Sequence, residues 1–147
     1  MIRFSVGLVC MFAVIFGALA LEGIPIMVLF GFTPFLIVFL IPLIASASVW
    51  KWGELGRAWK DAFSKVKLQE SSRTSISIWD FFEKTYYASG ILGTLMGFTF
   101  VFSIMNQTKP EEFLPKLGVC LLSLCYGVIF GIIAKILKMR VNQRMTE

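Results

Sequence analysis

The sequence predicts an all-α protein that crosses a membrane with four helices. Of the 147 residues, 57% are hydrophobic and only 16% are charged, a composition outside the range of soluble domains. Four long stretches contain no charged residue, and each is long enough to cross about 30 Å of hydrocarbon at about 1.5 Å per residue. The basic residues also lie mostly on one side of these stretches, as they do in membrane proteins.

The expected spans lie at residues 4–21, 24–50, 85–108 and 117–134. Gly23 and Pro25 end the first helix and start the second. The short basic start and the small residues near position 20 also fit a signal peptide, but the long apolar stretch leads almost directly into the second span. We expect Pro34 and Pro42 to kink the second span, or to let it begin with an interfacial segment at residues 30–34.

Basic residues define the orientation. Twelve of the 14 Lys and Arg residues lie at the N-terminus, between Lys51 and Lys84, or after the fourth span, and two lie between residues 109 and 116. Both termini and the link of residues 51–84 are therefore expected in the cytoplasm. The net charge of +5 then requires no nucleic acid as partner. We expect residues 1–147 to form a single domain.

The cytoplasmic link is expected to contain a short amphipathic helix at residues 51–68. Trp59 and Phe63 lie on its apolar stripe, with basic residues elsewhere, a pattern suited to the surface of the inner leaflet and its lipids. A helix that packs only on its protein neighbours is equally compatible with the pattern. Ser77 followed by Asp80 then predicts the start of the third helix.

Small residues recur four positions apart in the third and fourth spans, although glycine is a poor helix former. In lipid, small residues let helix backbones approach closely. These faces pack on each other within one subunit, or they face a partner helix or a pore. The hydroxyls of Thr94 and Ser123 favour the second interpretation. The candidate packing residues are Ser89, Gly90, Gly93, Gly97, Gly127 and Gly131.

The sequence offers no set of nucleophile, base and orienting group, so no enzymatic activity is expected. It has no histidine, and Cys10, Cys120 and Cys125 lie within spans without metal-ligand spacing, so we expect no metal and no cofactor. No span contains an acidic residue, although an intramembrane carboxylate is the usual mark of a proton relay.

Three segments carry a resemblance to a known family. The segment LEGIPIMVLFGFTPFLIVFL resembles the first hairpin and second span of the MotA branch of the MotA/TolQ/ExbB proton-channel family. The segment ASGILGTLMGF resembles the third span, with its Gly-Thr-x-x-Gly core at Gly93, Thr94 and Gly97. The segment GVCLLSLCYGVIFGIIAKIL is similar to the fourth span, with Tyr-Gly at Tyr126 and Gly127.

The resemblance implies a subunit of a proton- or sodium-driven motor in the bacterial inner membrane. Five copies would surround a dimer of a single-span partner of the MotB/TolR/ExbD type, whose membrane aspartate carries H+ or Na+. Helices three and four of this chain would line the centre. Thr94, Ser123 and Tyr126 are then the expected residues of the ion pathway.

The chain also departs from the family. Ser89 replaces a proline at the head of the third span, and Leu124 replaces a threonine three residues before Gly127. The 34-residue link from Lys51 to Lys84 leaves no room for the large cytoplasmic domain of flagellar members, which makes this a compact form. An alternative function is therefore a non-conducting membrane assembly or scaffold protein with the same fold. A small four-helix transporter fits less well, because it needs a binding charge near the middle of the bilayer.

Overall fold

The computed structural model describes residues 6–7, 9–10, 13–14, 17, 31–64, 73–104 and 110–146. The chain divides into two compact units, Met1–Gly31 and Phe32–Glu147, which we describe separately. In the first unit the described residues other than Gly31 are helical. Most of the first expected span lies outside the described residues, as does the turn that follows it.

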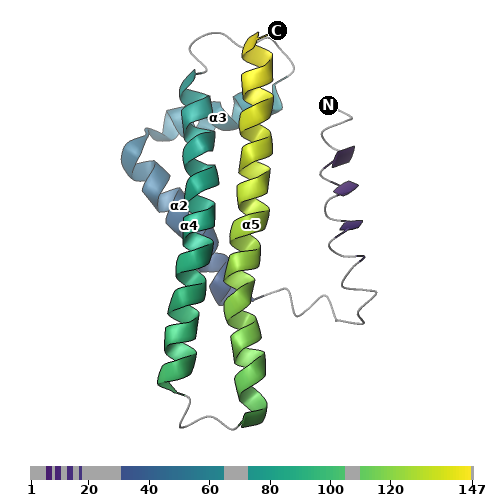
Figure 1. Cartoon of the computed structure of the whole chain (residues 1–147). Helices are drawn as coiled ribbons and strands as arrows, with labels where there is room; N and C mark the ends of the chain where they lie inside the picture. Colours follow the sequence, from purple (N-terminus) through teal and green to yellow (C-terminus); the bar gives the residue numbers. More distant parts are fainter. Residues whose placement is uncertain are drawn as a thin grey trace. The chain divides into compact units, whose positions relative to one another are not determined.

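The second unit contains the helices α2 (Phe32–Val49), α3 (Trp52–Phe63), α4 (Arg73–Ser103) and α5 (Pro110–Thr146). Helices α4 and α5 run side by side as an antiparallel pair, α2 packs against both, and the short α3 crosses near the start of α4 (Figure 1). Three of these helices, α2, α4 and α5, are long and apolar enough to cross a membrane. The prediction of an all-α fold is therefore confirmed, with three candidate spans in the described part of the chain.

Helix α2 packs with a face of residues spaced four apart. Pro34, Val38, Pro42 and Ser46 are all buried. Pro34 lies in the first turn, where its missing N–H costs nothing, and the helix continues through Pro42. Because the same face carries all four residues, α2 can lie along the groove between α4 and α5.

The prediction that the third helix starts at Ser77 is wrong, because α4 is already helical at Arg73. Ser77 donates a hydrogen bond to the Arg73 carbonyl, at 3.4 Å, from within the helix. The turns before and after it are fixed by packing, since Ser75 and Ile78 are 2% and 0% exposed. Tertiary burial thus extends the helix upstream of the expected cap.

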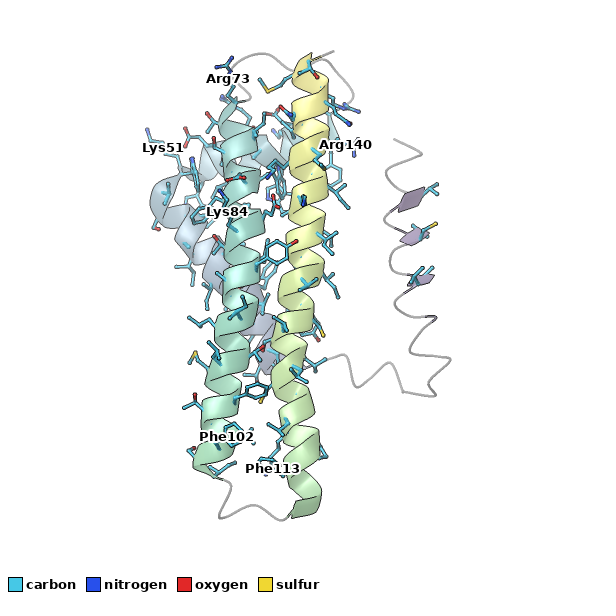
Figure 2. All side chains as sticks on the ribbon, in the orientation of Figure 1. Lys51, Arg73, Lys84, Phe102, Phe113 and Arg140 are labelled. Atoms are coloured by element: carbon cyan, nitrogen blue, oxygen red, sulfur yellow. The ribbon has the colours of Figure 1, made fainter. Side chains whose placement is uncertain are left out.

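Helix α5 is longer than the expected fourth span and continues through Thr146. Beyond residue 134, Leu137 and Val141 are 2% and 0% exposed, so the extension packs on the rest of the unit. At the opposite end of the pair, the rings of Phe102 and Phe113 lie 6.2 Å apart (Figure 2). Contacts at both ends therefore hold α4 and α5 in register.

A cluster of ion pairs joins α4 to α5 beyond their uncharged segments. Lys138 of α5 donates to Asp80 at 2.9 Å and to Glu83 at 2.5 Å, and Lys84 pairs with Asp80 at 2.7 Å. Hydrogen bonds from Lys84 and Lys138 lower the pKa of Asp80 below its usual 3.8. Hydrogen bonds to Glu83 and Asp80 raise the pKa of Lys138 above 10.5.

We expect Lys138→Met to lower the free energy of unfolding by about 1–2 kcal/mol, because it leaves the 13%-exposed Glu83 without its cation. Lys135→Met, on the exposed side of α5, is the matched control and should leave stability unchanged. Thermal unfolding of the detergent-purified variants tests this, and equal losses in the two variants would contradict it.

The stability that the ion pairs of Lys138 contribute has a predicted pH dependence. The contribution of Asp80 is present above pH 3.8 and is lost as the pH falls through its lowered pKa. The contribution of Lys138 is present below pH 10.5 and is lost as the pH rises through its raised pKa. The stability difference between wild type and Lys138→Met should therefore stay constant between about pH 5 and pH 9. Unfolding scans across this range measure it.

Candidate functional site

The seam between α4 and α5 is built from small residues on both helices. A Cβ added at Gly90 would lie 2.9 Å from the Cα of Gly127, and one added at Gly127 would lie 2.7 Å from the Cα of Gly90. These distances are too short for any side chain, so the two backbones are in direct contact at this level. Glycine is therefore required by close approach rather than by backbone conformation.

The contact continues in both directions along the seam. A Cβ at Gly93 would lie 2.9 Å from the Cβ of Ser123, and one at Gly97 would lie 2.7 Å from the Sγ of Cys120. In the other direction, a Cβ at Gly131 would lie 2.7 Å from the ring of Tyr87. The small residues of the third and fourth spans thus face each other within one chain, one of the two interpretations that the sequence left open. Packing around a partner helix stays a prediction.

Ser89 joins α4 to α2. Its side chain is 2% exposed. The hydroxyl lies 3.0 Å from the carbonyl of Tyr86 in its own helix and 3.4 Å from the carbonyl of Val38 in α2. A serine here therefore supplies a polar contact between two membrane helices.

Thr94 is buried against α5. Its hydroxyl lies 3.0 Å from the carbonyl of Gly90, one turn earlier, and 3.2 Å from the carbonyl of Cys120 in α5. The single O–H is shared between these two acceptors, and the oxygen keeps lone pairs that can accept a hydrogen bond or bind a cation. Thr94 thus ties the two helices of the seam together.

Ser123, rather than Leu124, faces α4. Ser123 is 2% exposed and lies against Gly93, whereas Leu124 is 38% exposed. The hydroxyl of Ser123 therefore lies on the seam, about one helical turn from the contact between Thr94 and Cys120.

Tyr126 lies elsewhere. Its ring packs edge-on against Phe35 of α2, with ring centroids 5.9 Å apart, in an aromatic cluster that also contains Phe39 and Phe130. The structure therefore places Tyr126 on the side of α5 that faces α2, and it brings Thr94 and Ser123, but not Tyr126, to the seam.

A cavity of about 380 Å³ lies among α2, α4 and α5, on the side of the glycine contact nearer the α4–α5 connection. Most of its walls are apolar, and its polar side chains are Thr33, Lys116 and Ser123. The direct contact between Gly90 and Gly127 closes the seam beyond Ser123. The cavity is thus lined by the hydroxyls of Thr33 and Ser123 and by the side chain of Lys116, with no carboxylate among its lining residues.

Two features escaped the sequence analysis. Asp80 and Glu83 are three residues apart on α4, and Lys138 follows the apolar stretch of the neighbouring antiparallel helix. That spacing of opposite charges was a readable signal for the ion-pair cluster. The carbonyl of Cys120 as the partner of Thr94 had no such signal, because any backbone group along the helix could have met it. Among the described residues, no group of His, Cys, Asp and Glu could hold a metal ion.

Residues 58–147 match the MotA/TolQ/ExbB proton channel family. This match covers more than half of the chain and contains α4, α5 and the whole seam. The chain belongs to the MotA/TolQ/ExbB proton channel family. It is a multi-pass membrane protein of a transport family and not an enzyme. A search of curated proteins found no match to this chain.

We expect Gly127→Ala to force α4 and α5 apart, because its Cβ would meet the backbone of Gly90 at 2.7 Å. The expected loss of stability is about 1–3 kcal/mol. Gly118→Ala is the matched control on the same helix, since an added Cβ there meets nothing within 4 Å. This control should be neutral or stabilising by up to about 1 kcal/mol. Thermal unfolding in detergent compares the two, and an unchanged midpoint for Gly127→Ala would refute the close contact.

Proposed function

We propose that this chain is the ring-forming channel subunit of a proton- or sodium-driven membrane motor. The observation that carries the proposal is the α4–α5 seam. It lies in the part of the chain that matches the family, and it holds two helices together by backbone contact while burying the hydroxyls of Thr94 and Ser123. A rigid wall with oxygen ligands suits a pathway for a desolvated ion.

The titrating group comes from a partner. A proton- or sodium-driven channel needs a group that takes up and releases the ion in the membrane. Residues 85–108 and 117–134 contain no carboxylate. We assign this role to the membrane aspartate of a MotB/TolR/ExbD-like single-span protein, present as a dimer. Each charge that crosses the membrane releases about 2.3 kcal/mol per 100 mV, enough to drive a small rotation step.

The proposed assembly is a pentamer of the MotA-like branch in its compact form. Each chain is a single domain with four membrane helices and cytoplasmic termini, in the bacterial inner membrane. One face of α4 points away from α5 and is strongly exposed in the single chain. The exposed large side chains of this face include Ile91, Leu92, Leu95, Met96 and Phe100.

This exposed apolar face of α4 is available to a neighbouring copy or to the partner helix. In this assembly the seam residues Ser89, Gly90, Gly93, Gly97, Gly127 and Gly131 act on the partner indirectly. They fix the spacing of the two helices that surround it. Tyr126, packed on α2, lies behind this wall and supports the ion pathway from outside.

One observation favours the alternative, a non-conducting assembly protein. The hydroxyl of Thr94 donates to carbonyls of its own chain, and Leu124, at the position of the family threonine, points away from the seam. If these hydroxyls serve only packing, the chain keeps the fold without conducting. Measurements of assembly and of ion uptake separate the two functions.

We expect five copies in the purified protein. Native mass measurement in detergent, alone and with the partner, tests this expectation. A clean monomer or dimer under both conditions would rule out the ring. The variant Gly118→Ala adds a methyl group that meets nothing in its own chain. A change in its number of copies would therefore show that this surface of α5 contacts a neighbouring copy.

We expect Thr94→Val to reduce ion uptake about tenfold, because an apolar side chain of the same shape removes one ligand contact worth about 1–1.5 kcal/mol. Thr94→Ser retains the hydroxyl and should conduct. Ser123→Ala should have a smaller effect. Proton or sodium uptake into vesicles containing the protein and its partner measures this, with native mass as the check on assembly. Equal uptake by wild type and by a variant that combines Thr94→Val with Ser123→Ala would favour the alternative, a non-conducting scaffold protein.

A further inference from the structure

Helix α3 uses one face to pack on the protein. Leu55, Ala58 and Ala62 of this face are 7%, 0% and 0% exposed. The indole N–H of Trp79 in α4 donates to the Ala58 carbonyl at 3.2 Å. The hydroxyl of Ser75 in α4 donates to Asp61 at 2.6 Å. Helix α3 is thus attached to the first turns of α4 by burial and by two hydrogen bonds.

A second apolar face of α3 is about half exposed or more, although one edge of it contacts α4, where the ring of Trp59 packs edge-on against that of Trp79 with centroids 5.0 Å apart. Trp52, Trp59 and Phe63 are 70%, 49% and 47% exposed. Trp59 and Phe63 follow Trp52 by 7 and 11 residues, and this spacing aligns the three side chains along one side of the helix. The rings of Trp59 and Phe63 stack with centroids 6.2 Å apart and planes 8° from parallel. Three large aromatic side chains in one exposed line mark a contact surface.

One positive charge lies beside this aromatic line. Arg57 and Lys60 are both exposed, but Lys60 lies about 80° around the helix from Trp52 and Arg57 lies about 140° from it, toward the opposite side. The two acids of the helix interact within the chain, since Asp61 accepts from Ser75 and Glu54 accepts from the backbone of Lys51 at 3.1 Å. The outer surface of α3 is therefore aromatic and basic.

The attachment of α3 also fixes its depth. Its hydrogen-bonding partners on α4, Ser75 and Trp79, lie at least six residues before the uncharged stretch that begins at Thr85. Asp80 and Glu83, with their partner Lys138, lie at the same end of the pair. Helix α3 is thus attached about 9–15 Å before the uncharged stretch of α4, at about 1.5 Å per residue, on the headgroup side of the apolar part of the membrane. Tryptophan is enriched on this side.

We infer that α3 lies on the cytoplasmic leaflet, inserts Trp52, Trp59 and Phe63 among the lipid headgroups, and binds anionic phospholipid headgroups through Lys60. The inference rests on the proposed membrane orientation and on no other part of the proposed function. Because α3 is hydrogen-bonded to α4, lipid bound to α3 also holds the cytoplasmic end of the α4–α5 pair.

Hydrogen exchange of the full chain in lipid nanodiscs tests the inference. The nanodiscs contain phosphatidylcholine alone or phosphatidylcholine with phosphatidylglycerol. We expect exchange in residues 52–63 to slow about fivefold or more when the anionic lipid is present. Lys60→Gln should abolish this difference, whereas Arg57→Gln, which removes an exposed charge from the opposite side of α3, and Lys135→Gln, which removes one from α5, should retain it.

A second variant separates insertion from charge. Trp52→Ser with Phe63→Ser, which leaves the contact between Trp59 and Trp79 in place, should speed exchange in α3 in both lipids and leave the exchange of residues 85–103 unchanged, which shows that the fold is intact. Protection of α3 that does not depend on lipid composition would overturn the inference and indicate that a second copy of the chain covers the aromatic line. The experiment needs neither the partner nor ion uptake, so its failure is distinct from a failure of the motor function.

Discussion

The contact between the backbones of Gly90 and Gly127 is the constraint on which the rest of the structure depends. Two apolar helices gain little from hiding side chains from lipid, so their association depends on close packing and on polar contacts. Where these backbones touch, neighbouring groups come within reach of each other. Thr94 reaches the carbonyl of Cys120, and Gly131 receives the ring of Tyr87. A single added methyl at this level would lengthen all of these contacts together.

The other helices secure the pair from outside. Helix α2 lays its Pro34, Val38, Pro42 and Ser46 face against both, and the hydroxyl of Ser89 reaches the Val38 carbonyl. At the charged end, Lys138 holds Asp80 and Glu83, and α3 covers the first turns of α4. These contacts make α4 and α5 one stiff element. A motor subunit that transmits a small step needs such stiffness, because a flexible wall would absorb the motion.

In the proposed function, the work of the channel is divided between two proteins. This chain contributes hydroxyls and backbone carbonyls, which can coordinate an ion or order water but do not take up a proton near neutral pH. The proposed partner contributes the carboxylate. The cavity extends to Ser123, and the backbone contact at Gly90 closes the seam beyond it. In the proposed motor, the exposed face of α4 is the surface offered to the partner or to a neighbouring copy.

The sequence by itself determined the apolar spans, the family and the small residues of the seam, because hydrophobicity, charge and glycine spacing are local properties of the chain. It also identified the aromatic and basic composition of α3. Only the tertiary structure decided that the seam residues face each other and that Tyr126 faces α2 rather than Thr94. The start of α4 at Arg73 instead of Ser77 was likewise decided by burial against neighbouring helices. Which side of a helix meets which neighbour depends on rotation and register, and these are fixed by packing between segments far apart in the chain.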